Sequence, residues 1–349
     1  MRAVPTFSLL KLRASYGLTG NAEIDNFASR GLYRGDAGYA GVPGQRPDQI
    51  ANPDLRWEQT TQTDIGLEFG FFNNQLSGEV DYYIKNTRDL LLNVNVPGTS
   101  GFRSQLCNIG MLENKGWEFV LRSENLTGDF KWNTSLNLAA NRNNILNLDG
   151  QVIEGGFLNR AVEGQPIGTF FGIEYAGVDQ ANGDALYYTN EERPDGSRDR
   201  STTDNPNDAQ RVVLGNPNPL LIGGINNSFS YKGIELNVLF QGQSGNDIYN
   251  GGGKFQSANG DFFDNQTVDQ LDRWQNPGDI TNVPQARLFG ANGTAESSRY
   301  LQSGSYLRLK TATLSYTLPA KLISRARLDR VYVTGQNLLT FTNYTGWDP

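Results

Sequence analysis

The chain of 349 residues contains no histidine and a single cysteine, Cys107. Without histidine, no Ser-His-Asp or Cys-His catalytic arrangement, no HExxH zinc helix and no imidazole metal site can form. One cysteine permits neither an internal disulfide nor a CxxC motif. Acidic residues outnumber basic ones by 37 to 30, whereas nucleic-acid-binding proteins generally present a basic face. The composition therefore argues against imidazole- or thiol-dependent enzymes and predicts no nucleic-acid partner.

Long apolar runs are missing as well. No segment approaches the roughly 18 consecutive apolar residues of a transmembrane helix, and residues 1–20 lack the basic start and apolar stretch of a signal peptide. A membrane-spanning β-strand needs only about 10 residues of alternating hydrophobicity, so a membrane location stays open. Residues 345–349 resemble the beginning of a loop, and we therefore expect a truncated chain.

The sequence instead contains a repeated alternation of apolar and polar residues, which predicts an all-β, antiparallel fold. In the run 61–71, for example, apolar Leu67 and charged Glu68 belong to opposite faces. In the run from Tyr306 to Leu318, the apolar residues switch from one face to the other near Thr311, which predicts a β-bulge. Ten segments fit the alternation: 7–19, 60–72, 75–92, 113–124, 129–142, 166–178, 219–231, 233–246, 304–318 and 328–340.

The connections between these segments have two lengths. Tight turns are expected at 73–74, 125–128 and 232–233, and long connections rich in Gly, Asn, Asp and Pro at 20–59, 93–112, 179–218 and 247–303. Short turns at one rim and long loops at the other are typical of transmembrane barrels, and soluble folds seldom have structureless connections longer than about 15 residues. The layout favours a transmembrane β-barrel. The alternative is a secreted soluble β-sandwich, such as a glycan-binding adhesin, which also buries one face of each strand.

Carboxylates recur on the polar face of the expected strands. In a barrel these residues would face a hydrated lumen. Paired carboxylates could also hydrolyse a glycoside, but on long regular strands a hydrated wall is the simpler interpretation. We therefore predict no enzymatic activity, no catalytic residue and no cofactor. The lumen-facing candidates are Asp64, Glu68, Glu79, Asp81 and Glu235.

The long loops carry aromatic residues among Asn, Asp and Gly. Such rings could stack on sugars, pack the loops together or contact a partner protein, and the pattern does not separate these three interpretations. The candidates for a ligand or partner site are Tyr33, Tyr39, Tyr187, Tyr188, Phe255, Phe262, Phe263 and Trp274. The segment 179–184 also places oxygen ligands near a glycine, as calcium loops do, but it lacks the bidentate glutamate, and an Asx-rich turn is the simpler interpretation.

Several short motifs resemble the SusC/RagA-type TonB-dependent outer-membrane transporters. Each motif is weak alone, but together they occur in the same order from about residue 9 to residue 349. They are NPDLRWE at 52–58, TTQTDIG at 60–66, VDYY at 80–83, TRDLL at 87–91, NIG at 108–110, NKGWE at 114–118, GQPIG at 164–168, GNPNP at 215–219, GSYLRLK at 304–310 and GQNLL at 335–339.

The resemblance implies a fold and a function. The fold would be a 22-stranded barrel with a plugged lumen, of which residues 1–349 would form the C-terminal part, an incomplete barrel or open curved sheet without the plug domain or the closing strand. The function would be active import of large nutrients, glycans or peptides, through the outer membrane of a Gram-negative bacterium. Such transporters work beneath a SusD-like lipoprotein and draw energy from the TonB complex.

Overall fold

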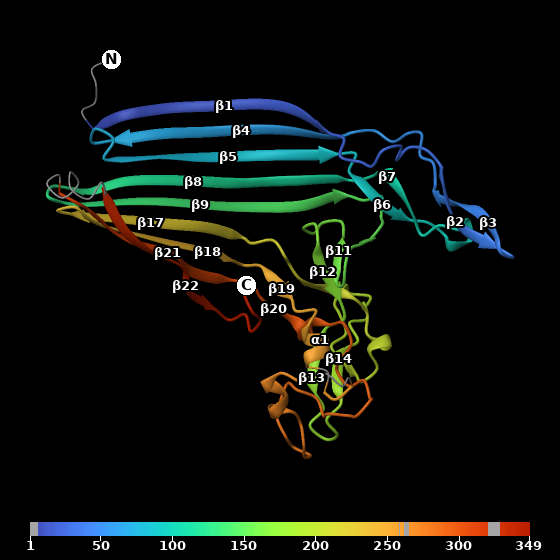
Figure 1. Cartoon of the computed structure of the whole chain (residues 1–349). Helices are drawn as coiled ribbons and strands as arrows, with labels where there is room; N and C mark the ends of the chain where they lie inside the picture. Colours follow the sequence, from blue (N-terminus) through green and yellow to red (C-terminus); the bar gives the residue numbers. More distant parts are fainter. Residues whose placement is uncertain (1–5, 258, 262–264, 320–328) are drawn as a thin grey trace.

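The computed structural model of the protein describes residues 6–257, 259–261, 265–319 and 329–349. Its main body is one antiparallel sheet, open at both edges, with the strand order β1-β4-β5-β8-β9-β17-β18-β21-β22 (Figure 1). The strands are β1 (Phe7–Asn21), β4 (Glu58–Phe71), β5 (Leu76–Arg88), β8 (Met111–Thr127), β9 (Phe130–Asn147), β17 (Leu221–Tyr231), β18 (Ile234–Ser244), β21 (Tyr306–Thr317) and β22 (Arg330–Thr342).

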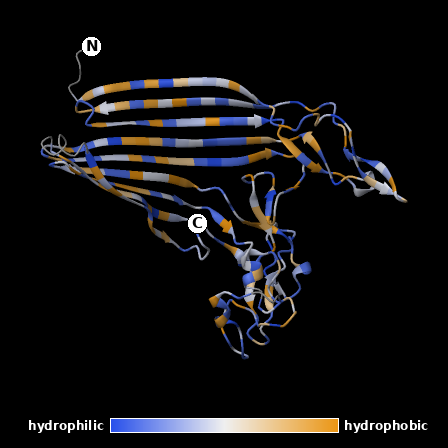
Figure 2. Cartoon of the chain, in the orientation of Figure 1, coloured by the Kyte–Doolittle hydropathy of each residue, from blue (hydrophilic) through white to orange (hydrophobic). Residues whose placement is uncertain are grey.

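The alternation of the sequence becomes two chemically different faces of this sheet, visible as alternating colours along each strand in Figure 2. The apolar face is defined by the row of paired residues Leu12, Leu67, Val80, Phe119, Leu138, Gly223, Gly242, Leu307 and Phe341. The polar face is defined by the row Lys11, Glu68, Glu79, Val120, Asn137, Gly224, Gln241, Arg308 and Thr340.

Nine of the ten predicted strands are confirmed in this sheet, and the segment 166–178 is the exception. It forms two short strands outside the sheet, β12 (Thr169–Gly172) and β13 (Tyr175–Val178). Gly168 and Gly177 have positive φ and interrupt the run. Both faces of β12 are largely buried. The prediction from alternating residues assumes a strand with one buried and one exposed face, and β12 does not meet that assumption. The predicted bulge is also present, because the register shifts at Lys310 on both sides of β21.

The two classes of connection lie at opposite ends of the strands (Figure 1). The tight turns join β4 to β5, β8 to β9 and β17 to β18. At the other end the long connections carry two hairpins, β2 (Leu32–Tyr39) with β3 (Val42–Gln49) and β6 (Leu91–Asn95) with β7 (Ser104–Asn108). The described residues of the connections 148–220 and 245–305 fold together into a compact body below the sheet in Figure 1, which we call the loop lobe.

The loop lobe consists of small sheets. Their strands are β10 (Ile153–Glu154), β11 (Asn159–Ala161), β12 and β16 (Val212–Gly215); β13, β14 (Ala185–Tyr188) and β15 (Thr202–Thr203); and β19 (Asp247–Tyr249) with β20 (Leu301–Ser303). Its helices are α1 (Gly253–Gln256), η2 (Pro206–Asp208), η3 (Val268–Asp272) and η4 (Ser298–Tyr300), and η1 (Gly98–Ser100) lies between β6 and β7. Among the described residues, no helix has the length and hydrophobicity that a membrane span requires.

Most of the buried apolar side chains belong to the loop lobe or to its junction with the sheet. They include Ile145, Leu148, Ile153, Leu158, Ala161, Phe170, Ile173, Ala185, Tyr187, Trp274 and Tyr300. The apolar face of the sheet is exposed instead, as Leu12 at 73% and Trp117 at 57% show. Within the described part of the chain no second sheet covers that face, so the sandwich alternative is not supported.

Candidate functional site

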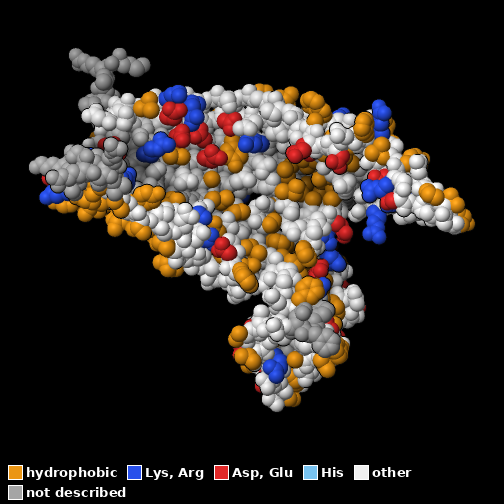
Figure 3. Space-filling view, in the orientation of Figure 1, with side chains coloured by type: hydrophobic (Ala, Val, Ile, Leu, Met, Phe, Trp, Pro, Cys, Tyr) orange, Lys and Arg blue, Asp and Glu red, His pale blue; other side chains and the backbone are white. Residues whose placement is uncertain are grey.

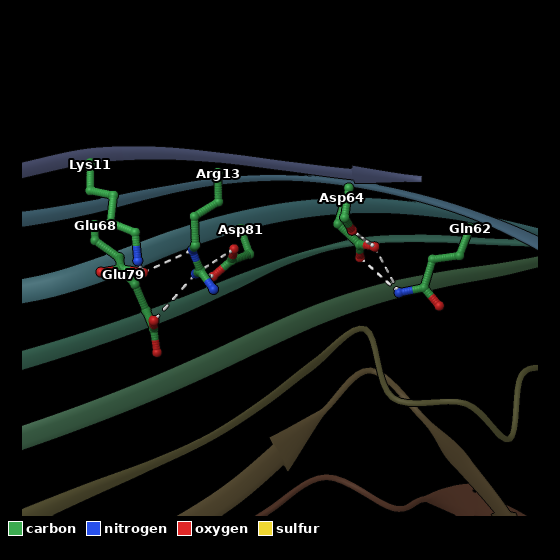
Figure 4. Close-up of polar contacts among 8 residues, drawn as sticks. Lys11, Arg13, Gln62, Asp64, Glu68, Glu79 and Asp81 are labelled. Carbon is green, nitrogen blue, oxygen red and sulfur yellow. Dashed lines mark hydrogen bonds and ion pairs between the residues drawn. The ribbon is translucent and has the colours of Figure 1, made fainter. Parts of the chain in front are cut away.

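A cluster of opposite charges lies on the polar face of β1, β4 and β5 (Figures 3 and 4). Arg13 Nε lies 3.0 Å from Glu68 Oε1, and Arg13 Nη2 lies 2.9 Å from Asp81 Oδ1 and 3.4 Å from Glu79 Oε2. Lys11 Nζ lies 3.2 Å from the same oxygen of Glu68. Two cations on the outermost strand therefore compensate three carboxylates that the neighbouring strands bring together.

Gly66 makes the central contact of this cluster possible. In the sheet register it pairs with Arg13 on one side and with Asp81 on the other. A Cβ atom at position 66 would lie 2.0 Å from Asp81 Oδ1 and 3.1 Å from Arg13 Nη2. Any larger residue would therefore displace the ion pair that this glycine accommodates.

The other two carboxylates proposed for the lumen lie apart from the cluster. Asp64 accepts hydrogen bonds from Ser15 Oγ at 3.0 Å and from Gln62 Nε2 at 2.8 Å. Glu235 Oε2 lies 2.7 Å from Arg330 Nη2, near the opposite edge of the sheet. The structure thus places all five candidates on the polar face but brings only Glu68, Glu79 and Asp81 together.

A cavity of about 970 Å³ lies between the loop lobe and the segment 344–348 that follows β22. Its wall is built from three segments far apart in the sequence: 175–177, 250–302 and 344–348. Most of the polar groups that line it are uncharged hydroxyls and amides, among them those of Asn250, Gln256, Asn282, Ser298 and Gln302. Such groups both donate and accept hydrogen bonds, which suits sugar hydroxyls and peptide bonds.

Four aromatic residues of the described chain line this cavity, Tyr175, Tyr300, Tyr344 and Trp347, and Arg299 lies beside the first two. The guanidinium carbon of Arg299 lies 5.9 Å from the ring centre of Tyr175 and 5.3 Å from that of Tyr300, a distance at which a cation and a ring attract each other. Burial raises the pKa of both tyrosines. Their hydroxyls therefore stay protonated, and they donate to the carbonyl oxygens of Asn282 at 3.0 Å and of Gly293 at 2.8 Å.

The predicted loop aromatics divide into buried and exposed residues. Tyr187 and Trp274 are only 2% and 5% exposed, so these two pack the lobe together. Trp274 also donates from Nε1 to a backbone carbonyl 3.1 Å away. Tyr33 and Tyr39 on the β2–β3 hairpin are exposed. The guanidinium carbon of Arg200 lies 3.5 Å from the ring centre of Tyr188.

Three further aromatic candidates belong to the 247–303 connection. Phe255 is partly exposed on α1, while Phe262 and Phe263 lie outside the described residues. Of all the predicted aromatic candidates, none is among the described residues that line the large cavity.

The segment 179–184 adopts an Asx-rich turn. Asp179 Oδ1 accepts a hydrogen bond from the backbone N–H of Ala181, and Asn182 Oδ1 accepts one from that of Asp184. Asp184 Oδ1 also lies 2.5 Å from Arg287 Nη2, and a cation partner competes with a bound metal ion. Across the described residues there is no group of three or more acidic, thiol or imidazole side chains suited to hold a metal.

Comparison with known proteins agrees with this architecture. Residues 3–167 match the family described as TonB dependent receptor-like, beta-barrel. The whole chain is 36% identical to the TonB-dependent receptor P26 of Formosa agariphila and 28% identical to the TonB-dependent receptor SusC of Bacteroides thetaiotaomicron. It also superposes on the RagAB peptide transporter with a TM-score of 0.87, at 31% identity over 99% of the chain.

The chain belongs to the SusC/RagA-type TonB-dependent receptor family. It spans 37% and 36% of the length of the two curated relatives and 39% of the matched RagAB chain. By name, these relatives are TonB-dependent receptors and a peptide transporter. In this family the nine-stranded sheet corresponds to barrel wall.

The sequence alone did not predict two groups of contacts: the charged cluster around Arg13, and the contacts of Arg299 with Tyr175 and Tyr300. Gly66 could have predicted the central position of Arg13. It lies between charged residues on the polar face of its strand, and in the sheet register it pairs with Arg13. Tyr175, Arg299 and Tyr300 carry no comparable signal. They meet because segments more than 100 residues apart in the sequence fold together in the lobe. The alternation of apolar and polar residues predicts strands but does not predict contacts between such distant segments.

Proposed function

We propose that the protein is an outer-membrane importer of a Gram-negative bacterium that takes up oligosaccharides or peptides with energy from the TonB complex. The observation that carries this proposal is the two-faced sheet whose long connections all leave from one end (Figure 1). Such an arrangement matches a barrel wall with short turns at one rim and large loops at the other. The family of the chain, established above, supports the same role.

In this proposal the apolar face contacts lipid and the polar face lines the lumen. Ile65 and Trp117, 52% and 57% exposed on the apolar face, would be costly to leave in water. The charged cluster around Arg13 would be costly to place in lipid. We further propose that the nine strands form the C-terminal part of a larger barrel with a separate plug, because the chain corresponds to little more than a third of its relatives.

The large cavity beside the loop lobe is the proposed ligand site. Its uncharged hydroxyl and amide groups, with the rings of Tyr175 and Tyr300, suit an oligosaccharide or a peptide. The similarity to the RagAB peptide transporter supports peptide import, and the similarity to SusC keeps glycans in the same proposal. We also propose that a SusD-like lipoprotein covers the loops, which expose apolar side chains such as Ile280 and Leu288.

Growth of three strains would test the proposal: one with the intact gene, one with the gene deleted and one whose protein lacks the connection 247–303. On a panel of oligosaccharides and oligopeptides, the gene deletion should abolish growth on one substrate class. The loop deletion should do the same while the protein still assembles in the outer membrane. Unchanged growth on every substrate, together with unchanged capture of the lipoprotein, would contradict the assigned function of the loops.

A further inference from the structure

Arg299 is the only cation among the described residues that line the large cavity. It belongs to the short helix η4, and it forms no ion pair with a carboxylate of the described part of the chain. Four other arginines of the loop lobe do so: Arg160 with Glu154, Arg193 with Asp199, Arg200 with Glu174 and Arg287 with Asp184. Unlike these four, Arg299 brings to the cavity wall a positive charge that the described side chains leave without a counter-ion.

The side chain of Arg299 is nevertheless held in place. Its Nη1 donates to the carbonyl oxygen of Gly293 at 2.7 Å and to Tyr300 Oη at 3.2 Å. Gly293 permits this contact, because it has a φ of +83° and a Cβ atom there would lie 2.7 Å from Nη1. Both partners are neutral, so they orient the guanidinium without neutralising it. Because the side chain is already ordered, binding of a ligand to it costs little side-chain entropy.

Two nitrogen atoms of the guanidinium can still donate to a ligand. Nη2 makes a single long contact, 3.5 Å from Asn259 Oδ1, and Nε has no hydrogen-bond partner among the described residues. The N–H groups of Nε and Nη2 are parallel, so together they match the two oxygen atoms of one carboxylate. A ligand carboxylate would also supply the negative charge that Arg299 lacks as a partner.

Two carboxylates also lie among the described lining residues, but neither pairs with Arg299. Asp348 forms an ion pair with Arg308 of β21, and Asp269 accepts a hydrogen bond from Gln270 Nε2 at 3.2 Å. Asp269 thus adds a negative charge to the wall, and like charges repel each other. The cavity therefore suits a ligand with a single carboxylate better than a polyanion.

We infer that Arg299 binds a single carboxylate of the imported molecule, through parallel hydrogen bonds from Nε and Nη2. The inference rests on the proposed function and deepens it, because it assumes that this cavity holds the imported molecule. The uncharged hydroxyl and amide groups of the wall bind the rest of that molecule. Two sources supply such a carboxylate, the C-terminus of a peptide and a uronic acid of an oligosaccharide, and the test below separates them.

Equilibrium dialysis of the full-length protein in mild detergent would test this assignment. One probe is a pool of octapeptides without Asp or Glu, as free acids or as C-terminal amides. The other is a pool of xylo-oligosaccharides with one glucuronic acid, as free acids or as methyl esters. The wild-type protein should retain the free acids of one pool about tenfold more strongly than their neutral counterparts, because one charge-assisted interaction contributes about that factor. The pool in which this preference occurs identifies the source of the carboxylate.

Variants assign the preference to Arg299. Arg299→Gln should remove the preference for the acids, whereas Arg299→Lys keeps the charge without the parallel donors and should retain a preference of about threefold. Arg273→Gln is the matched control and should keep the full preference. Arg273 belongs to the same connection and also donates to a backbone carbonyl, but it is not among the residues that line the cavity. Limited proteolysis of each variant reports whether the lobe is still folded.

Two results would overturn the inference: equal retention of the acids and their neutral counterparts by the wild-type protein, or a preference for the acids that persists in a folded Arg299→Gln protein. The comparison of acids with neutral counterparts needs no variant, so it holds even if Arg299→Gln fails to fold. The growth test of the proposed function is independent of both results. A protein that supports growth on a substrate but shows no preference for acids contradicts only the inference, whereas a protein that supports no growth contradicts the proposed function.

Discussion

The nine-stranded sheet and the loop lobe bury apolar surface in opposite ways. In the lobe, Leu148 and Tyr187 are almost inaccessible to solvent and belong to two small local cores. In the sheet, Leu12 and Val333 are 73% and 66% exposed on the apolar face. The lobe therefore carries its own core, as a water-soluble domain does, whereas the sheet needs an apolar surrounding outside the chain.

This difference indicates which forces stabilise each region. The sheet is held by long ladders of backbone hydrogen bonds and by contacts between aromatic side chains on its apolar face, such as Tyr82 with Trp117. The lobe has short strands and depends on a small number of buried side chains and side-chain hydrogen bonds. Substitutions should therefore act locally in the lobe, and according to the face on which they lie in the sheet.

The largest effect is expected from Trp274→Ala in the lobe. Trp274 is 5% exposed, its ring lies 2.5 Å from the position of a Cβ on Gly183, and its Nε1 donates to Gln180. Truncation of a buried tryptophan costs about 3–5 kcal/mol, so the lobe should become sensitive to limited proteolysis. The sheet should keep its resistance to heat in detergent, as followed by gel mobility.

Leu271→Ala provides the control for that change. Leu271 belongs to the same connection but is 69% exposed, so its truncation should leave proteolysis of the lobe unchanged. If Trp274→Ala instead lowered uptake without any change in proteolysis, Trp274 would be a ligand residue, and the description of it as a packing residue would be wrong.

The next effect concerns the two faces of the sheet. Leu67 and Glu68 are neighbours on β4 and belong to opposite faces. An arginine in the middle of the lipid-facing surface costs about 2–4 kcal/mol, so Leu67→Arg should lower the free energy of unfolding of the full-length protein in lipid vesicles by that amount. Glu68→Gln, on the polar face, should change it much less. Equal losses in the two variants would contradict the assignment of the faces.

The same contrast explains how much of the structure could be predicted from the sequence. Strands such as β4 and β5 have one apolar and one polar face. Their sequences therefore alternate between apolar and polar residues, and this alternation predicts the strands. Strand β12, within the predicted strand 166–178, is buried on both faces. The sequence therefore predicted a strand there but assigned it to the large sheet instead of the four-stranded sheet of the lobe. Likewise, composition identified Tyr187 and Trp274 as notable aromatics, but only the contacts of the folded lobe distinguish a packing residue from an exposed one.

A smaller effect is expected at the charged cluster. Among the described residues, Arg13 forms ion pairs with three carboxylates, whereas Lys11 forms one, with Glu68. Because Arg13 is 41% exposed and exposed ion pairs contribute about 0.2–1 kcal/mol each, Arg13→Gln should lower the free energy of unfolding by about 1 kcal/mol. Lys11→Gln should lower it by less than half of that, and added salt should reduce both differences. An equal loss in the two variants would show that Arg13 is not the centre of the cluster.

The smallest effect is a pH dependence confined to the loop lobe. Arg200 donates to both carboxylate oxygens of Glu174, at 2.6 and 2.9 Å, and this interaction lowers the pKa of Glu174. A carboxyl whose pKa is lower in the folded state stabilises that state above its unfolded value, about 4.5, and the contribution is lost as the pH falls through the lower folded value. Both side chains are partly exposed, so the contribution is only about 0.5 kcal/mol.

Limited proteolysis of the lobe at pH 7 and at pH values below about 4 would measure this contribution. The wild-type lobe should be cleaved faster at the lower pH, and Glu174→Gln should be cleaved faster than wild type at pH 7 and show a smaller pH dependence, because other lobe carboxyls such as Asp199 also have a lowered pKa. Glu191→Gln, at an exposed carboxyl in the same lobe, should leave both rates unchanged. If Glu174→Gln retained the full pH dependence, the acid-sensitive contact of the lobe would have to lie elsewhere, because the pair with Arg200 is then not the group that titrates.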